Sequence, residues 1–132
     1  MAHSTQVVGK VSEMTAARAL LNLGWEVAQP LCAEVYDLVA KDPVSGEWAT
    51  VQVKTLHIRP DRRNALVVFA RKGNGTAYSE SDCDYIIGVR DETVYMFENR
   101  GLQEYWSTEA SVAKRWVKLN VVGEETTKTE AV

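Results

Sequence analysis

The chain has 132 residues, of which 45% are hydrophobic and 25% are charged, and its formal net charge at pH 7 is −3. This composition indicates one folded domain with an ordinary core, and no apolar run approaches the roughly 20 residues of a membrane-spanning helix. The first residues lack the basic and apolar regions of a secretory signal. We therefore expect a cytoplasmic protein without a membrane partner.

The predicted elements begin with a helix over residues 8–23. Apolar side chains recur there near the helical period, and Gly24 follows as a helix stop. Segments rich in β-branched and aromatic residues come next, separated by turn-forming residues. These predicted strands cover residues 25–28, 35–40, 49–58, 65–70, 84–89 and 94–97.

Two pairs of neighbouring strands predict hairpins. The pair 35–40 and 49–58 flanks a turn that contains Pro43 and Gly46. The pair 84–89 and 94–97 is joined by four polar residues. Strands that follow one another this closely in the chain favour antiparallel pairing.

A second helix is predicted over residues 108–119, with Val112 and Trp116 on one side. A helix, a run of strands and a terminal helix, in this order, predict an α+β fold with a mixed, mainly antiparallel central sheet flanked by helices. We expect this single domain to cover residues 1–122 and the polar segment 123–132 to form a disordered tail.

The first predicted hairpin carries the residues that point to chemistry. Side chains alternate between the two faces of a strand, so Gln52 and Lys54 project together. The hairpin brings Asp37 beside them on the same face. An acid, an amide oxygen and a lysine placed together suit metal-assisted hydrolysis of a phosphodiester. The alternative is that they form the solvated face of an antiparallel sheet.

These residues supply the oxygen ligands that Mg²⁺ prefers. Asp37 is the expected anchor, and the Gln52 amide and the Val53 carbonyl complete the ligands from the protein. Lys54 at the same metal would orient or help deprotonate the attacking water, or stabilise the developing negative charge. We expect Mg²⁺ as the cofactor, with Mn²⁺ able to replace it.

A basic segment follows this candidate site. From Gln52 to Lys72 there are six positive residues and one acid, Asp61, so the local charge is 6 − 1 = +5. Such a segment favours contact with a phosphate backbone, and the alternative is a solvated face without a ligand. The predicted DNA contacts are Arg59, Arg62, Arg63, Arg71, Lys72 and Tyr78.

Glu13 on the first helix, then Asp37, then Gln52-Val53-Lys54 resemble the pattern of the PD-(D/E)xK nuclease superfamily. The resemblance implies a restriction-endonuclease-like core with one metal site. It implies that Glu13, Asp37, Gln52 and Lys54 are catalytic, and that Glu13, Asp37, Gln52 and Val53 surround the metal. The implied activity is hydrolysis of DNA by an endonuclease.

The resemblance extends from about Gly9 to Phe97 and has two departures. Tyr36 precedes Asp37 where a proline is usual, and Gln52 stands where an acid is usual. The glutamine removes one negative charge and is expected to weaken metal binding. Within the superfamily, Gln-x-Lys is typical of homing endonucleases of group I introns, which rank first. Archaeal-type Holliday junction resolvases are similar in size and order but usually keep Glu at position 52, and they rank second.

The expected partner is double-stranded or branched DNA, in a bacterial or phage context. One such domain carries one metal site and would cut one strand, so we expect a homodimer or a dimer of dimers. Apolar residues near the carboxyl end are candidates for that contact, although packing on the protein's own sheet is the alternative. They are Trp106, Val112, Trp116 and Val117.

Two further functions remain open at this point. Beside the active endonuclease, one alternative is a DNA-binding module that has lost catalysis, with Gln52 as a sign of decay. The other is a protein without a nucleic-acid role, whose basic segment meets an acidic partner. DNA binding without cleavage would favour the first. A DNA affinity that does not fall with salt would favour the second, because phosphate binding weakens steeply as salt rises.

Overall fold

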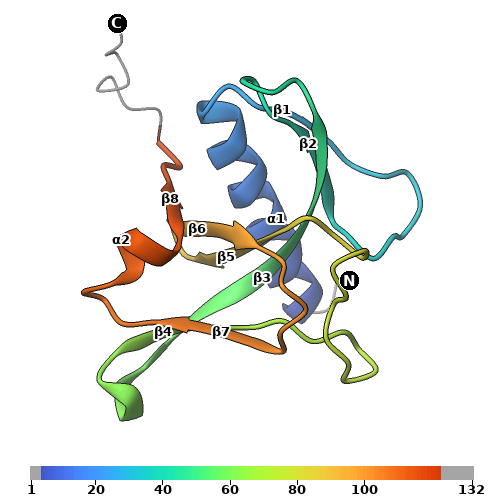
Figure 1. Ribbon diagram of the computed structural model, residues 1–132. Coiled ribbons are helices and arrows are strands. Elements are labelled where there is room, and N and C mark those ends of the chain that lie inside the picture. The colour runs from blue at the N-terminus through green and yellow to red at the C-terminus, as the bar shows by residue number, and fades with distance from the viewer. Residues whose placement is uncertain (1–3, 123–132) are drawn as a thin grey trace, which may run out of the picture.

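The computed structural model describes residues 4–122, so the tail expected over residues 123–132 lies outside the described residues. Within them a sheet of eight strands is joined by two helices (Figure 1). The helices are α1 (Ser4–Asn22) and α2 (Val112–Arg115). The strands are β1 (Glu26–Ala28), β2 (Leu38–Lys41), β3 (Trp48–Arg59), β4 (Ala65–Phe69), β5 (Tyr85–Arg90), β6 (Thr93–Glu98), β7 (Glu104–Ser107) and β8 (Val117–Leu119). Across residues 4–122 no helix is long and apolar enough to cross a membrane.

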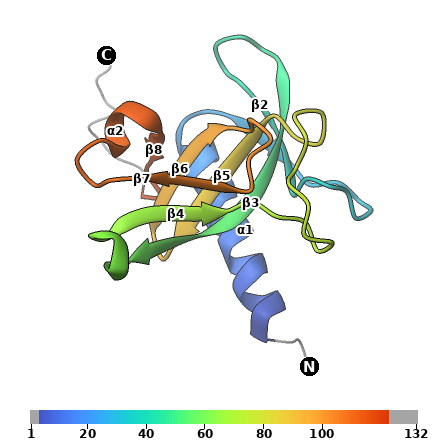
Figure 2. The ribbon, with the colours of Figure 1, turned by 60° about the horizontal axis from the view of Figure 1, so that its bottom comes forward.

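Helix α1 forms where the apolar period predicts it, beginning four residues earlier. It lies against one face of the sheet and is held there mainly by its last turns, through the buried residues Ala16, Ala19 and Leu20 (Figure 1). Two alanines bring the helix backbone close to the strands. The amino-terminal turns extend beyond the sheet (Figure 2), so Val8 and Val11 stay exposed although they fit the apolar period.

Strand β3 is the centre of the sheet. It pairs antiparallel with β2 through residues 48–51, as the first predicted hairpin requires. It pairs parallel with β5 through residues 51–55, and antiparallel with β4 through residues 56–59. Between the ladders to β2 and β4, residues 52–55 therefore have only β5 as a strand partner, and the predicted catalytic residues of β3 lie in this interval.

The sheet is strongly curled, because β4 and β7 turn away from β1 and β2 and lie over β5 and β6 (Figure 2). One core lies between α1 and the sheet and includes Leu38 and Val51. A second core fills the inside of the curl and includes Leu56, Val68 and Ile86. The alternation predicted for β3 is thus observed. Val51 faces the helix, whereas Leu56, which shares its strand face with Gln52 and Lys54, faces the inside of the curl.

The carboxyl-terminal part differs from the sequence prediction. The helix predicted over residues 108–119 is wrong: α2 spans only Val112–Arg115, and Trp116 already has extended backbone angles. Val112 and Trp116 are spaced like two residues on one helix face, and both are buried in the second core. The same spacing is therefore produced by one helical turn, after which the chain continues into β8. Strand β7 was not predicted.

Candidate active site

Asp37 lies directly before β2 and is bound to the backbone of β3. Its N–H donates to the Val51 carbonyl at 2.9 Å, and its Oδ2 accepts a hydrogen bond from the Val53 N–H at 3.0 Å. The Asp37 side chain thus satisfies a backbone N–H of β3 beyond the edge of β2, where β3 has no antiparallel strand partner. The N–H and C=O of one strand residue point to the same edge, so the Val53 carbonyl also faces the side of β3 on which Asp37 lies.

The side-chain amide of Gln52 is buried without a hydrogen-bond partner among the described residues. The residue is 9% exposed. Buried amides are normally satisfied, so such an exception calls for a ligand or water. Because it shares a sheet face with Asp37 and Lys54, the Gln52 amide oxygen is available to the same site.

Lys54 projects from the same face but makes no direct ion pair with Asp37. Its Nζ donates to the Arg71 carbonyl at 2.9 Å and lies 5.1 Å from the centre of the Tyr78 ring. Both partners belong to the segment between β4 and β5. This contact was not predicted, because Tyr78 is 24 positions from Lys54 and nothing in the sequence pattern links them.

Glu13 reaches the site from α1. Its carboxylate accepts a hydrogen bond from the Lys10 ammonium at 3.1 Å, three residues earlier on the helix. Glu13, Lys10 and Asp37 line one shallow hollow together with the segment 29–36. The structure therefore brings the predicted acids together and adds Lys10, which the sequence analysis did not single out. An i, i+3 acid–base pair is the signal that would have found it.

The carboxyl of Asp37 titrates abnormally. Partial burial is the largest cause and raises its pKa, because water is lost around the charged form; the hydrogen bond from the Val53 N–H opposes this. The Glu13 charge raises the pKa of Asp37 further, whereas Lys54 and Lys10 lower it from a distance. The net shift is upward. A raised carboxylate pKa beside a second acid is typical of a site that receives a cation.

The donor set fits a hard divalent cation. Among the described residues no group of three or more His, Cys, Asp or Glu side chains could hold a metal ion. The available donors are instead the Asp37 carboxylate, the unpartnered Gln52 amide and the Val53 carbonyl, with Glu13 nearby. All are oxygens, which suits Mg²⁺ with several retained waters and does not suit a thiolate- or imidazole-preferring metal.

The predicted DNA contacts fall into two groups. Arg59, Arg62 and Arg63 lie at the tip of the β3–β4 hairpin, where Arg59 pairs with Asp61 at 2.8 Å and Arg62 with Glu104 at 3.0 Å. Arg59 follows Lys54 by five positions along β3, which is about 17 Å at the usual rise of a strand.

The second group belongs to the segment 70–84 beside Lys54. The Arg71 guanidinium lies 5.6 Å from the Phe69 ring, and Lys72 pairs with Asp82 at 2.7 Å. Tyr78 is only 6% exposed, so most of its surface contacts protein rather than a ligand.

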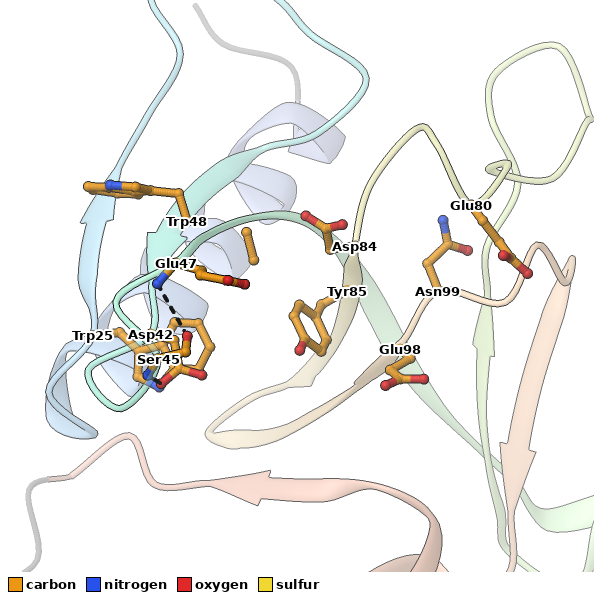
Figure 3. A pocket seen from close by; sticks show the side chains of 11 residues that line it. Trp25, Asp42, Ser45, Glu47, Trp48, Glu80, Asp84, Tyr85, Glu98 and Asn99 are labelled. Carbon is orange, nitrogen blue, oxygen red and sulfur yellow. Dashed lines mark hydrogen bonds between the residues drawn. The ribbon is translucent and has the colours of Figure 1, made fainter.

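A larger hollow lies elsewhere, between β3, β5 and the turn before β3 (Figure 3). Its lining includes Asp42, Glu47, Asp84 and Glu98. This charge repels a phosphate backbone. The Asp84 carboxylate already accepts a hydrogen bond from the Thr50 N–H at 2.8 Å, which is a structural role. This acidic hollow therefore does not suit a phosphate ligand, and Asp37 is not part of its lining.

Comparisons with known proteins agree with this geometry. The solved structure of a bacterial homing endonuclease, I-Ssp6803I, matches with a TM-score of 0.65 and 26% sequence identity, over 81% of this chain and 80% of that chain. The agreement confirms the predicted restriction-endonuclease-like fold. A search of curated proteins found no significant match. A family model described as PD-(D/E)XK endonuclease matches residues 3–115. The chain therefore belongs to the PD-(D/E)XK endonuclease family.

Proposed function

We propose that the protein is a metal-dependent endonuclease that cuts double-stranded DNA at a specific sequence, as a homing endonuclease does. The observation that carries the proposal is the buried, unpartnered Gln52 amide on the same face as Asp37 and Lys54. A merely solvated sheet face would have an exposed glutamine. The name of the structural neighbour supports the homing type of activity.

Asp37, the Gln52 amide oxygen and the Val53 carbonyl would hold Mg²⁺, with Glu13 completing the site directly or through water. The ion supplies neutralisation of the phosphate charge and acidification of water. Lys54 provides a positive charge and N–H donors where negative charge develops on the phosphate, or orients the attacking water. Glu13 keeps Lys10 close, which offsets part of the repulsion between the two acids.

The assembly is proposed to be a homodimer or a dimer of dimers, because one site cuts one strand. Val112 and Trp116 are buried within the protomer, so they are not available for this contact. Trp106 and Val117 remain exposed on the surface and keep their place as candidates. Light scattering that gives a monomer even with DNA would contradict a dimer.

The test is cleavage of linear duplexes from the source genome, with and without Mg²⁺, beside a four-way junction. We expect Mg²⁺-dependent cutting at one duplex sequence by the wild type. Lys54→Ala should lose cutting by at least about 100-fold, as removal of one charge-stabilising donor typically does. Its DNA affinity and thermal stability should change little.

The other outcomes are distinct. Cutting confined to the junction would make the protein a junction resolvase. DNA binding without cutting in Mg²⁺ or Mn²⁺ would make it a binding module. If Lys54→Ala cut as fast as the wild type, the proposed site would be wrong.

A further inference from the structure

The segment between β4 and β5 covers Lys54 with an aromatic ring and a carbonyl. Nζ of Lys54 lies 5.1 Å from the centre of the Tyr78 ring and 2.9 Å from the Arg71 oxygen. An ammonium has three N–H donors, so at least one donor stays available for a phosphate or a water. The ring and the carbonyl together restrict a side chain that would otherwise sample many rotamers.

This segment is built to keep its shape. A single β-bridge joins Arg71 to Ala77, and Lys72 pairs with Asp82 at 2.7 Å with both side chains partly buried. The Lys72 N–H donates to the Thr76 carbonyl at 2.8 Å. These contacts close a small loop immediately before Tyr78.

Beyond Tyr78 the segment is tied to the rest of the protein by Asn99. This buried side chain donates to the Ser79 carbonyl at 2.8 Å and to the Cys83 carbonyl at 3.0 Å. Its Oδ1 accepts from the Gly101 N–H at 3.0 Å and from the Tyr105 hydroxyl at 3.2 Å. The Asn99 amide nitrogen thus holds the backbone that follows Tyr78, and its Oδ1 ties Asn99 to Gly101 and Tyr105.

We propose that Tyr78 is a positioning residue for Lys54, acting through the face of its ring. The inference rests on the proposed function, because it assigns Lys54 a task in phosphodiester cleavage. Tyr78 sits in the second core beside Leu56, at a position set by packing. A lysine is a flexible point charge, and its effect on a reacting phosphate falls quickly when it is misplaced. The ring lowers the energy of one placement of Nζ by a cation–π contact.

The phenol hydroxyl has no part in this mechanism, so variants that keep the ring can be compared with variants that remove it. Tyr78→Phe keeps the ring and Tyr78→Leu removes it. Tyr95→Leu is the matched control: Tyr95 belongs to the same core and is 8% exposed, close to the 6% of Tyr78, and its ring contacts Trp116 instead of Lys54.

The experiment is single-turnover cleavage of the preferred DNA at saturating Mg²⁺, with thermal denaturation of each variant. Tyr78→Leu should lower the cleavage rate at saturating enzyme by about fivefold, in line with a cation–π contact of a partly exposed ammonium. It should leave the half-saturating concentration within about twofold. Tyr78→Phe should stay within about twofold of the wild type. Tyr95→Leu should lose similar stability and keep its cleavage rate.

A second readout needs no catalysis. In the metal-free protein the Hε protons of Lys54 should show an upfield ring-current shift by NMR that Tyr78→Phe keeps and Tyr78→Leu loses. If Tyr78→Leu does not fold, Tyr78→Met removes the ring and leaves a longer, unbranched side chain that can adapt to the space of the ring.

The proposal fails if wild type and Tyr78→Leu cleave equally, if Tyr95→Leu slows cleavage as much, or if the Lys54 shift is unchanged. These failures differ from failure of the proposed function, in which the wild type itself shows no Mg²⁺-dependent cleavage that Lys54→Ala removes.

Discussion

The Asp37 carboxylate is destabilised by partial burial and by the nearby charge of Glu13, and a purely structural residue would avoid both. Asp37 has no direct ion-pair partner among the described residues. The Val53 N–H is its one direct polar contact from a side-chain oxygen among the described residues. A carboxylate in this position is expected to destabilise the metal-free fold, which fits the metal ligand proposed above.

Asp37→Asn should therefore stabilise the protein without metal. The amide oxygen still accepts from the Val53 N–H, and the buried charge disappears. We expect a melting temperature higher by about 2–4 °C at pH 7–8 in EDTA, and loss of cleavage. Mg²⁺ should raise the melting temperature of the wild type and leave that of the variant unchanged. The measurement is thermal denaturation with and without Mg²⁺.

The pH dependence has a definite sign. Because the folded protein holds the Asp37 proton more tightly than the unfolded chain, ionisation destabilises the fold as pH rises through the folded-state pKa. The advantage of Asp37→Asn should be full at neutral pH and vanish below the ordinary pKa of aspartate. Asp84→Asn is the control, since Asp84 also accepts a β3 N–H but is exposed. A gain of the same size there would contradict the argument.

At the scale of elements, β5 approaches the side chains of β4 closely at Gly88. A Cβ placed on Gly88 would lie 2.7 Å from Cγ2 of Val68 and 3.6 Å from Cβ of Leu56. Gly88 pairs with Lys54 across the parallel ladder of β3 and β5. The absence of a side chain at Gly88 thus lets the second half of the sheet fold over the strand that carries the site.

Gly88→Ala should consequently destabilise the fold by about 1–3 kcal/mol, the usual cost of overpacking. Gly9→Ala provides the opposite case: Gly9 is in the exposed part of α1 with nothing within 4 Å of the added Cβ. There, alanine should stabilise by about 0.5–1 kcal/mol through helix propensity. Urea unfolding measures the change in the free energy of unfolding for both variants. Changes of the same sign would refute the steric explanation.

Local patterns predicted those elements whose partners are close in sequence. The β2–β3 and β5–β6 hairpins and α1 follow from periodicity and turn residues, and so does the shared face of Asp37, Gln52 and Lys54. The parallel β3–β5 ladder could not be predicted, because it joins segments more than 30 residues apart. Strand β7 has four residues, and its one partner is the distant β4.

The same limit applied to the site. The identities and spacing of the acids, the glutamine and the lysine were in the sequence. The contact of Lys54 with Tyr78 depends on how the segment before β5 folds back, which no period records. The pairing of Arg62 with an acid was equally hidden, because Glu104 lies 42 positions from Arg62.

At the scale of the whole molecule, charge is unevenly distributed. The net charge is −3, and acidic residues line the hollow beside Asp84, whereas the β3–β4 hairpin tip presents arginines. Two of those arginines already pair with acids, so Arg63 is the tip arginine without an ion pair in the described part of the chain. An acidic protein can bind DNA when the positive charge is gathered in this way.

Arg62→Gln combined with Arg63→Gln should raise the DNA dissociation constant about tenfold or more. The slope of log affinity against log salt should fall by about 2, one unit for each lost phosphate contact. The Mg²⁺-induced rise in melting temperature should persist. Lys41→Gln, opposite the first residue of β3, is the control. A slope that stays the same would remove the hairpin from the DNA interface; fluorescence anisotropy in a salt series measures it.

Strand β3 runs without interruption from the candidate site to the hairpin tip. The distance from Lys54 to Arg59 is therefore set by backbone geometry, at about 17 Å, or about five nucleotide steps along one strand of a duplex. The strand would then act as a fixed spacer between the proposed metal site and the proposed DNA contacts. If the hairpin tip holds backbone phosphates as proposed, the number of residues in one β-strand would fix how far the cut lies from those phosphates.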